Sequence, residues 1–409
     1  MIQHKEVIII GGGIWGLSTA YHLAKYGQKD VLILERNEEI AAETTPQAAG
    51  LVGQIRSSDI MFRAIQFGLE LFSQFQNEIR YDTGFCQTGS LMVALTPERM
   101  QAYTHQIERA NLNGIEAHYV SHEEMERLAP AMDMTKIEGG YFVANDGYVD
   151  PQLCAYAYAT ASRDLGVQIQ LNTTVTGFRQ NNGKISGVET DEGFIASNYV
   201  VITAGPWTGK LTKKVGETTA VQPIRHQRVR TEPTIGIPEQ HPVVRITDVS
   251  CYLRPEKGGY LYGYFEPDPV SIDLETKPTD FRTEHIEPPV EIMAEARRRI
   301  TPIFPILKDL GIAEYKRGMT TFAPDGNYMI GPVPEIERLY IATGCAALGI
   351  AGSAAVGHWL AKWVINGDPG EDLTIFSKHR FGTQANDMDW LRQESEQFYS
   401  NYYGIRPIK

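Results

Sequence analysis

The sequence predicts an α/β fold of two domains, one with a parallel sheet between helices and one with helices laid on a mixed sheet. Three observations lead to this prediction. The chain has 409 residues, more than a single hydrophobic core usually supports. Residues 6–36 follow the order strand, glycine turn, helix, strand, which is typical of the start of a parallel sheet. Residues 258–266 alternate aromatic and small side chains, as a half-buried strand does.

The first element, EVIIIGGGIWGLSTAYHLAKYGQKDVLILER, indicates a Rossmann-type dinucleotide site. Its glycines have GxGxxG spacing: the first allows a tight turn, the second lets the main chain approach a pyrophosphate, and the third lets the helix pack closely on the strand. Amides at the helix N-terminus face the phosphates, and the acidic residue that ends the second strand is placed to bind a ribose. The residues assigned to this site are Gly11, Gly13, Ile14, Trp15, Gly16, Glu35 and Arg36.

A second block, residues 146–207, predicts a helix from Pro151, a strand at 167–171, a hairpin across 180–184 and a strand at 199–205. Asn-Asn-Gly in the hairpin is strong turn chemistry. The segments DGYVDP, NTTVTG, TDEGFIA and VVITAGPW of this block resemble those of the D-amino-acid-oxidase-like flavoproteins. The resemblance implies that Val175 contacts the adenine of FAD through its main chain. It also implies that the pyrophosphate lies near Ala204 and Gly205, and Trp207 is likewise assigned to the cofactor.

A third block, residues 322–369, decides between FAD and NAD. It resembles the carboxy-terminal flavin segment of the same family, with a Pro-Asp-Gly turn, a strand that ends at Gly344 and a glycine-rich loop that enters a helix. Such a loop directs amide donors at an acceptor, here the pyrimidine edge of the flavin. Three returns of the chain to one cofactor favour FAD, although the alternative of a close-packed helix stays open. The residues assigned here are Gly344, Leu348, Gly349, Ile350 and Ala351.

Within this family the chain is most similar to dimethylglycine and sarcosine dehydrogenases and related N-methyl amino-acid oxidases. The segments that carry this resemblance are residues 48–58, 252–266, 318–326, 358–369 and 376–381. It implies FAD-dependent oxidation of the C–N bond of a secondary or tertiary, N-methylated amino acid: hydride passes to flavin N5, and the imine is hydrolysed to an amine and an aldehyde. Two alternatives stay open, namely a cyclic or primary amino acid such as proline or glycine, and a flavin subunit that does not act alone in an electron-transfer complex.

The blocks divide the chain into a discontinuous FAD-binding domain and an inserted substrate-binding domain. The first is expected to comprise residues 1–85, 145–220 and 316–409, and the second residues 86–144 and 221–315. The electron acceptor is O2 or another compound, between which the sequence does not decide. The aromatic tail at 389–403 is expected either to pack on its own domain or to contact a partner subunit or another copy of the chain.

Residues 43–58, ETTPQAAGLVGQIRSS, are expected to pass under the flavin ring. Threonine hydroxyls would reach the pyrophosphate, and small residues would let the main chain lie against the ring. In the similar dehydrogenases a Trp-His pair stands where this chain has Pro46 and Gln47, and that histidine is bonded to FAD. A cysteine used for attachment elsewhere in the family falls at Gly318, so we expect non-covalent FAD. The residues assigned from this segment are Thr44, Thr45, Gln47, Ala49, Gly50 and Leu51.

Three arginines are candidates to hold the substrate carboxylate, because a guanidinium binds a carboxylate through two parallel hydrogen bonds. They are Arg56, Arg225 and Arg254. Many glycine and D-amino-acid oxidases of the family carry Gly-x-Arg-Pro before the Pro-Asp-Gly turn. This chain has Thr320 in place of that arginine, so another residue is expected to bind the substrate carboxylate.

One histidine and two tyrosines complete the candidate catalytic group. His226 is expected to accept a proton from the substrate ammonium or to pair with a carboxylate, unless it is only packed in its strand. Tyr260 and Tyr262 are candidates for an aromatic cage around an N-methyl ammonium, unless they are core residues.

The composition excludes several other classes of protein. A net charge of −12, with no basic cluster beyond Arg297–Arg299, argues against nucleic-acid binding. The four cysteines have no metal or disulfide spacing, so no metal site is expected. The amino-terminal apolar run is too short for a signal peptide, and the apolar stretch at 339–365 is interrupted by glycines and charges. We therefore expect no membrane span and a cytoplasmic location.

Overall fold

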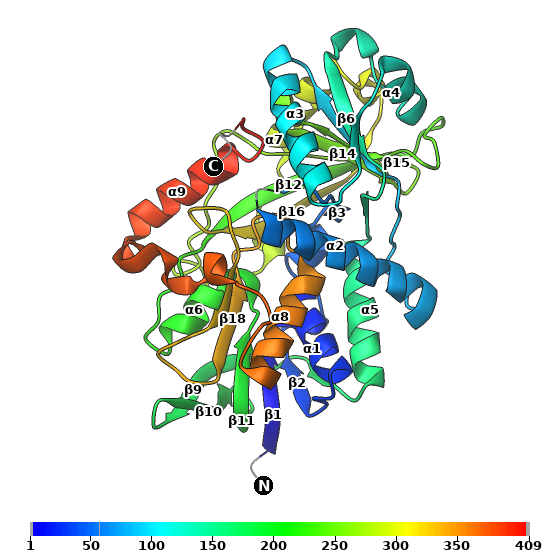
Figure 1. Cartoon of the computed structure of the whole chain (residues 1–409). Helices are drawn as coiled ribbons and strands as arrows, with labels where there is room; N and C mark the ends of the chain where they lie inside the picture. Colours follow the sequence, from blue (N-terminus) through cyan, green and yellow to red (C-terminus); the bar gives the residue numbers. More distant parts are fainter. Residues whose placement is uncertain (1–2, 57, 406–409) are drawn as a thin grey trace.

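The computed structural model describes residues 3–56 and 58–405, which form two large sheets that lie one above the other in Figure 1. The first sheet has the order β17-β18-β11-β1-β2-β8, and the β9–β10 hairpin extends from β11. Strands β1, β2, β8, β11 and β18 run parallel. The bounds are β1 (Gln3–Ile10), β2 (Val31–Leu34), β8 (Gln168–Gln170), β9 (Val175–Asn181), β10 (Lys184–Thr190), β11 (Gly193–Ile202), β17 (Met329–Pro332) and β18 (Leu339–Thr343).

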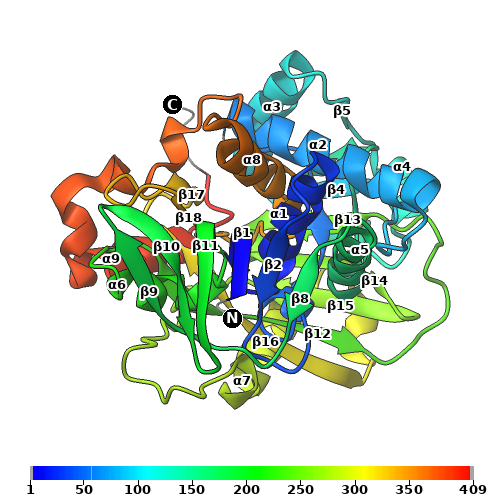
Figure 2. The same cartoon turned by 90° about the horizontal axis from the view of Figure 1, so that it is seen from below.

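Strand β1 shows why this sheet needs helices on both faces. Val7 and Ile9 join one hydrophobic cluster with the helices of one face, whereas Ile8 and Ile10 join another cluster on the opposite face. All four side chains are buried, as expected for a parallel strand. Viewed from below, α1 (Ile14–Lys25), α5 (Pro151–Asp164) and α8 (Ser353–Asn366) cover one side, and the hairpin and α6 (Thr208–Lys213) cover the other (Figure 2).

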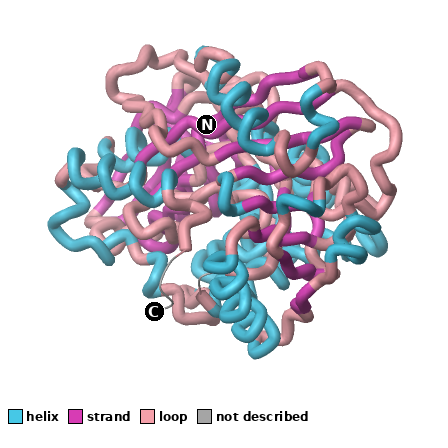
Figure 3. Tube along the Cα trace, turned by 90° about the horizontal axis from the view of Figure 1, so that it is seen from above, coloured by secondary structure: helices cyan, strands magenta, loops and turns pink. Residues whose placement is uncertain are grey.

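The second sheet has the order β16-β12-β15-β14-β13-β4-β6-β5. It is mixed, because β13 and β4 pair in parallel and the other neighbours pair antiparallel. Figure 3 shows the strands through the middle of the molecule and most helices around them. The bounds are β4 (Ser90–Ala94), β5 (Ala117–Tyr119), β6 (Gly139–Val143), β12 (Gln222–Thr231), β13 (Val243–Ile246), β14 (Cys251–Glu256), β15 (Gly259–Tyr264) and β16 (Ile312–Phe322).

Helices cover the outer parts of this second sheet. Helix α7 (Val290–Ile300) buries Met293, Ala296 and Ile300 against one face of β14 and β15. The remaining elements are α2 (Asp59–Gln74), α3 (Pro97–Leu112), α4 (His122–Leu128), α9 (Met388–Ser400) and the small β3 (Leu51–Val52) and β7 (Gly147–Tyr148) pair. Helix α9 packs on β12 and β16 of its own chain, with Leu391 and Tyr399 buried.

The predicted fold class is confirmed: a parallel sheet with helices on both faces is joined to a mixed sheet with helices laid on it. The predicted domain limits stay predictions, and the limit at residue 316 falls inside β16, which pairs with β12 of the second sheet. The apolar stretch at 339–365 forms β18, a loop and the buried helix α8, as expected. None of the helices in the described parts of the chain is long and apolar enough to cross a membrane.

Candidate functional site

A cavity of about 1330 Å³ lies between the two sheets. One end lies over the carboxyl ends of β1 and β2, and the other end lies under β12, β13 and β14 of the second sheet. Ligands of open α/β sheets bind at the carboxyl ends of the strands. The cavity is therefore the candidate site for both a cofactor and a substrate.

The glycine turn at the first end leaves room only for main chain. Gly11 has φ of +108°, and a Cβ there would lie 2.7 Å from the carbonyl oxygen of Thr203. A Cβ at Gly16 would lie 2.0 Å from the carbonyl oxygen of Gly11, so only glycine lets α1 approach this closely. Gly13 caps α1 without a side-chain hydrogen bond, which leaves amides of the first turn for an anion.

Glu35 is fixed at the end of β2 by two main-chain donors. Its carboxylate accepts hydrogen bonds from Gly12 N–H at 2.7 Å and Asn37 N–H at 2.9 Å. Burial raises the pKa of Glu35, and the two hydrogen bonds act in the opposite direction. The side chain lines the cavity, where its free lone pairs suit the hydroxyl pair of a ribose.

The side of this end away from the glycine turn carries an aromatic and cationic wall. The Arg36 guanidinium lies 4.0 Å from the ring centre of Trp207 and forms an ion pair with Glu43 at 2.9 Å. Val175, Ala204 and Gly205 line the same cavity. A flat base fits between such surfaces, which suits the adenine expected here.

The loop after β18 is held in an uncommon conformation. Ala346 and Ala347 have φ of +44° and +58°, values that few residues other than glycine adopt. Thr320 Oγ1 accepts a hydrogen bond from Ala347 N–H at 3.0 Å, and Thr321 Oγ1 accepts one from Cys345 N–H at 3.0 Å. Thr320, which stands where relatives carry a carboxylate-binding arginine, thus holds this loop.

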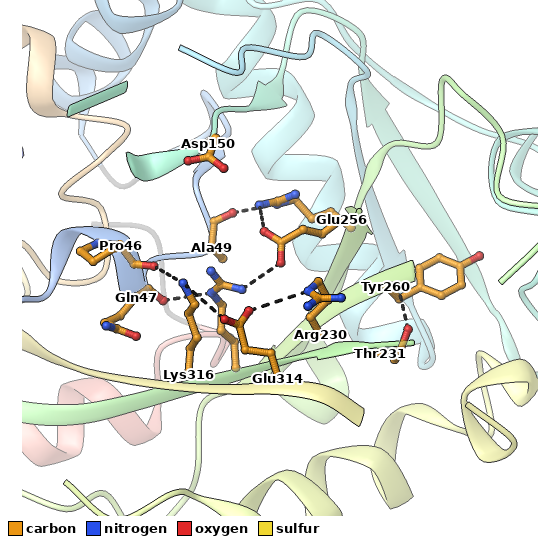
Figure 4. Close-up of polar contacts among 12 residues, drawn as sticks. Pro46, Gln47, Ala49, Asp150, Arg230, Thr231, Glu256, Tyr260, Glu314 and Lys316 are labelled. Atoms are coloured by element: carbon orange, nitrogen blue, oxygen red, sulfur yellow. Dashed lines mark hydrogen bonds and ion pairs between the residues drawn. The ribbon is translucent and has the colours of Figure 1, made fainter. Parts of the chain in front are cut away.

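Residues 44–51, here called the flavin loop, form the floor between the two ends. Thr45 Oγ1 accepts a hydrogen bond from Ile14 N–H at 3.2 Å, and Thr44 Oγ1 donates one to Met319 O at 3.0 Å. Carbonyl groups on the other side of this loop accept hydrogen bonds from side chains of the second sheet (Figure 4). The two positions used for covalent attachment in relatives meet here, because a Cβ at Gly318 would lie 3.0 Å from Gln47 Cβ.

All but two of the residues assigned to the cofactor line the cavity. The exceptions are Gly16 and Gly344, which lie behind its wall and serve close packing. The cavity size, the glycine turn with its uncapped helix and the acidic residue at β2 together fit FAD. The contact of each single residue with FAD stays a prediction.

Arg56 is the predicted arginine that the structure brings into the substrate end. Its Nη1 donates to Ile55 O at 2.9 Å, while its buried Nε has no hydrogen-bond partner among residues 3–56 and 58–405. Burial lowers its pKa, and nearby Arg245 acts in the same direction. Arg245, which the sequence analysis missed, donates to Ser90 Oγ at 3.0 Å and also lines the cavity.

The other two predicted arginines are engaged elsewhere, which corrects their assignment as carboxylate anchors. Arg225 forms hydrogen bonds of 2.8 and 2.9 Å with the carboxylate of buried Glu266. Arg254 pairs with Glu256 at 3.0 Å and donates to Ala49 O at 2.8 Å. Neither residue lines the cavity.

His226 lines the cavity, but both of its ring nitrogens are already in contact with hydroxyls. Nε2 lies 3.0 Å from Tyr252 Oη, and Nδ1 lies 2.9 Å from Tyr399 Oη. Burial lowers the pKa of His226 to about 3, so the ring is neutral at physiological pH. The expected role as a proton acceptor is therefore disfavoured, and the ring instead orients Tyr252 toward the cavity.

Tyr260 and Tyr262 point away from the cavity, which corrects the expected aromatic cage. They lie on the face of β15 that packs against α7, and Tyr260 contacts His241 and Phe304. The alternation of aromatic and small residues predicted the strand, but it did not tell on which face of the sheet the tyrosines lie. The aromatic residues that do line the substrate end come from other segments: Tyr103, Tyr141, Tyr252, Phe265, Tyr402 and Tyr403.

Only Tyr252 among these had a usable signal in the sequence, because it stands two residues before Arg254 and so shares its face of β14. Tyr402 stacks on Phe265 with ring centres 4.1 Å apart and an angle of 7°. Arg99 Nη1 donates to Tyr403 O at 2.9 Å. The segment after α9 is thereby fixed to the chamber wall, which no local pattern indicates.

The geometry defines a class of protein: a dinucleotide-binding protein in which a second, mixed sheet closes a chamber over the glycine turn of the first. The family model described as FAD dependent oxidoreductase (DAO) matches residues 6–363, and the chain belongs to this family. The predicted family and cofactor are confirmed: the protein is an FAD-dependent oxidoreductase.

Two relatives and one solved structure illustrate the similarity. The chain is 30% identical to 4-methylaminobutanoate oxidase (formaldehyde-forming) of Paenarthrobacter nicotinovorans, over 98% of this chain and 48% of that protein. It is 31% identical to mitochondrial dimethylglycine dehydrogenase of Rattus norvegicus, over 93% of this chain and 45% of that protein. The chain thus spans about half the length of these curated relatives. The structure of L-proline dehydrogenase from P. horikoshii superposes with a TM-score of 0.84 and 26% identity, over 93% of this chain and 98% of that chain.

Proposed function

We propose that the protein oxidises the C–N bond of a secondary or tertiary N-methylated amino acid and releases an amine and an aldehyde. The observation that carries the proposal is Arg56, a half-buried arginine that lines the same cavity as the cofactor site and whose buried Nε has no hydrogen-bond partner among the described residues. A buried cation is costly without an anion beside it. A substrate carboxylate supplies that anion and is bound through two parallel hydrogen bonds.

The residues of the chamber orient the substrate and keep its amine neutral. Arg56 and Arg245 bind the carboxylate, and their positive charge disfavours an ammonium close by. His226 adds no charge, because its imidazole is neutral. Tyr252 Oη forms a hydrogen bond with the amine, since burial raises the Tyr252 pKa and the hydroxyl stays protonated. The aromatic wall excludes water from the C–H bond that breaks. Bound FAD supplies the hydride acceptor.

The relatives support this substrate class through their names. One is an oxidase of 4-methylaminobutanoate that forms formaldehyde, and another is a dehydrogenase of dimethylglycine. A second candidate, a cyclic amino acid, is supported by the similarity of the fold to L-proline dehydrogenase. Both candidates place a carboxylate at Arg56, so they differ only in the shape of the amine.

Anaerobic titration of the purified yellow protein tests the proposal. Sarcosine, dimethylglycine, 4-methylaminobutanoate, proline and glycine are added in turn, and flavin absorbance near the visible maximum is followed. We expect N-methylated substrates to bleach the flavin and to release formaldehyde. Bleaching by proline alone would establish the second candidate, and a flavin that no amine reduces would favour a subunit that does not act alone.

We further propose that FAD is held without a covalent bond. Gln47 and Gly318 occupy the two attachment positions, and neither side chain provides a nucleophile. Acid or heat denaturation is therefore expected to release all the flavin into the supernatant. Yellow colour that stays with the precipitated protein would contradict this.

A further inference from the structure

We propose that three basic residues of the second sheet, Arg228, Arg254 and Lys316, form a cation clamp that holds the flavin loop and directs one of its amides at FAD. The clamp acts on the cofactor, not on the substrate, so the inference goes beyond the proposed function. Each of the three residues is a positioning residue, because it acts through the main chain of the loop.

The contacts of the clamp follow the loop in order (Figure 4). Lys316 Nζ donates to Pro46 O at 3.2 Å from β16. Arg228 Nε donates to Gln47 O at 3.0 Å from β12, and Arg254 Nε donates to Ala49 O at 2.8 Å from β14. Three strands of one sheet thus hold a single segment that belongs to the other half of the molecule.

The clamp is rigid because its two arginines are buried and share one carboxylate, while Lys316 lies 3.8 Å from Glu314. The Arg228 and Arg254 side chains are only 4% and 3% exposed. Glu256 lies between them, with its carboxylate 3.2 Å from Arg228 Nη1 and 3.0 Å from Arg254 Nη2. The Arg254 guanidinium also lies 4.4 Å from the ring centre of Tyr148. Charge-assisted hydrogen bonds in such a dry setting are strong and directional.

The orientation of the Ala49–Gly50 peptide follows from the Arg254 contact. In a trans peptide the carbonyl and the following N–H point in opposite directions, and no described peptide bond is cis. Since Ala49 O faces Arg254, Gly50 N–H faces away from it, on the side of the cavity that Gly50 lines. Among the described residues this N–H makes no hydrogen bond. The donor is therefore available for a cofactor atom.

No residue other than glycine fits at position 50. Its φ is +72°, and a Cβ at this position would lie 2.0 Å from Val149 O. In contrast, the amides of Gln47 and Ala48 are used within the loop, where they donate to Thr44 O and Thr45 O at 3.2 Å. The clamp thus leaves Gly50 N–H as a donor of this turn that is offered to FAD.

A matched control lies on the same strands. Arg230 stands two residues after Arg228 on β12 and pairs with Glu314 at 3.8 Å, but it makes no contact with the flavin loop (Figure 4). Its substitution therefore removes a partly buried arginine of the same sheet that reaches the clamp only through Glu314, whose carboxylate also lies 3.8 Å from Lys316 Nζ.

The test uses apoprotein titrated with FAD and the reduction potential of the reconstituted protein. Arg254→Met is expected to raise the FAD dissociation constant about tenfold or more, as loss of a charge-assisted hydrogen bond does. It is also expected to lower the flavin potential, because positive charge near the ring favours the reduced form. Arg254→Lys should restore part of both values, whereas Arg230→Met should leave both unchanged. Equal values for Arg254→Met and Arg230→Met would overturn the proposal.

A second measurement needs no variant and so does not depend on its folding. Hydrogen exchange of the Gly50 amide in the wild-type protein is compared with and without FAD. We expect the exchange of Gly50 N–H to slow at least about tenfold when FAD binds, because a hydrogen-bonded amide exchanges only on opening. An amide that exchanges equally fast in both states would show that the clamp does not direct this donor at FAD.

Discussion

The two ends of the cavity are built from different parts of the chain, main chain at one end and side chains at the other. The glycine turn of the cofactor end uses main chain from one short segment, where Gly11 and Gly16 let a strand, a turn and a helix meet at van der Waals distance. The substrate end uses side chains from separate elements, with Arg56 after β3, Arg245 on β13 and Tyr252 on β14. A site made of main chain tolerates no added atom, whereas a site made of side chains loses one contact at a time. Variants at the two ends should therefore fail in different ways.

Gly16→Ala should have the widest effect, because it should break the cofactor end on which flavin binding depends. The new Cβ would lie 2.0 Å from Gly11 O and 2.7 Å from Thr203 Oγ1, so helix and turn must separate. Overpacking of this kind costs about 1–3 kcal/mol, which corresponds to an FAD dissociation constant raised about 5- to 150-fold. The measurement is apoprotein titration with FAD. Gly209→Ala, at a position with no atom within 4 Å, is the control that should bind FAD normally.

Arg56→Gln should affect the substrate end and should leave the cofactor end intact. Loss of one partner from a buried, hydrogen-bonded charge pair costs about 2–5 kcal/mol, so kcat/KM should fall about 30- to 5000-fold while FAD content is unchanged. A substrate analogue without its carboxylate should show a similar loss with the wild-type protein. The variant should lose little more with that analogue, since the two changes remove the same contact. Additive losses would show that the carboxylate is bound elsewhere.

The same difference explains how far the sequence could predict each end. Glycine spacing, the strand pattern and Glu35 lie within a single segment, so the place of the glycine turn and Glu35 at the cavity could be predicted from local sequence, while their contacts with FAD stay a prediction. Tyr260 was placed on the wrong face because alternation identifies a strand but not which face a helix covers; α7 decided this. Arg245 and Tyr403 gave no local signal, since only the order of the strands and the path of the chain after α9 bring them to the chamber.

His226 should have a smaller effect, on the pH dependence of the free energy of unfolding. This effect distinguishes a buried neutral imidazole from a charged one. Its pKa in the folded protein is about 3, and in the unfolded chain it is about 6.5. Below pH 6.5 the unfolded state therefore binds a proton that the folded state does not, and stability falls as the pH falls toward 3. His226 should account for a loss of about 2 kcal/mol between pH 7 and pH 5.

The measurement is urea unfolding of wild type and His226→Gln at both pH values. His22 and His241 also have pKa values lowered by burial, to about 3 and about 4, but they are present in both proteins and cancel in the comparison. The stability of the variant should change less with pH by about 2 kcal/mol. Equal pH dependence would mean that His226 takes up its proton in the folded state.

Substitution of Tyr402 should give the smallest effect, and this effect should fall on the KM for the substrate. Its ring stacks on Phe265 and lines the chamber, whereas the ring of Tyr260 packs in the core below α7. An aromatic surface beside a cationic or N-methylated group contributes about 0.5–2 kcal/mol, so Tyr402→Leu should raise KM for an N-methylated substrate about 2- to 30-fold. Tyr260→Phe keeps its ring and should leave KM and kcat unchanged. The reverse result, in which Tyr260→Phe raises KM and Tyr402→Leu does not, would return the aromatic cage to β15 and place the chamber on the other face of the sheet.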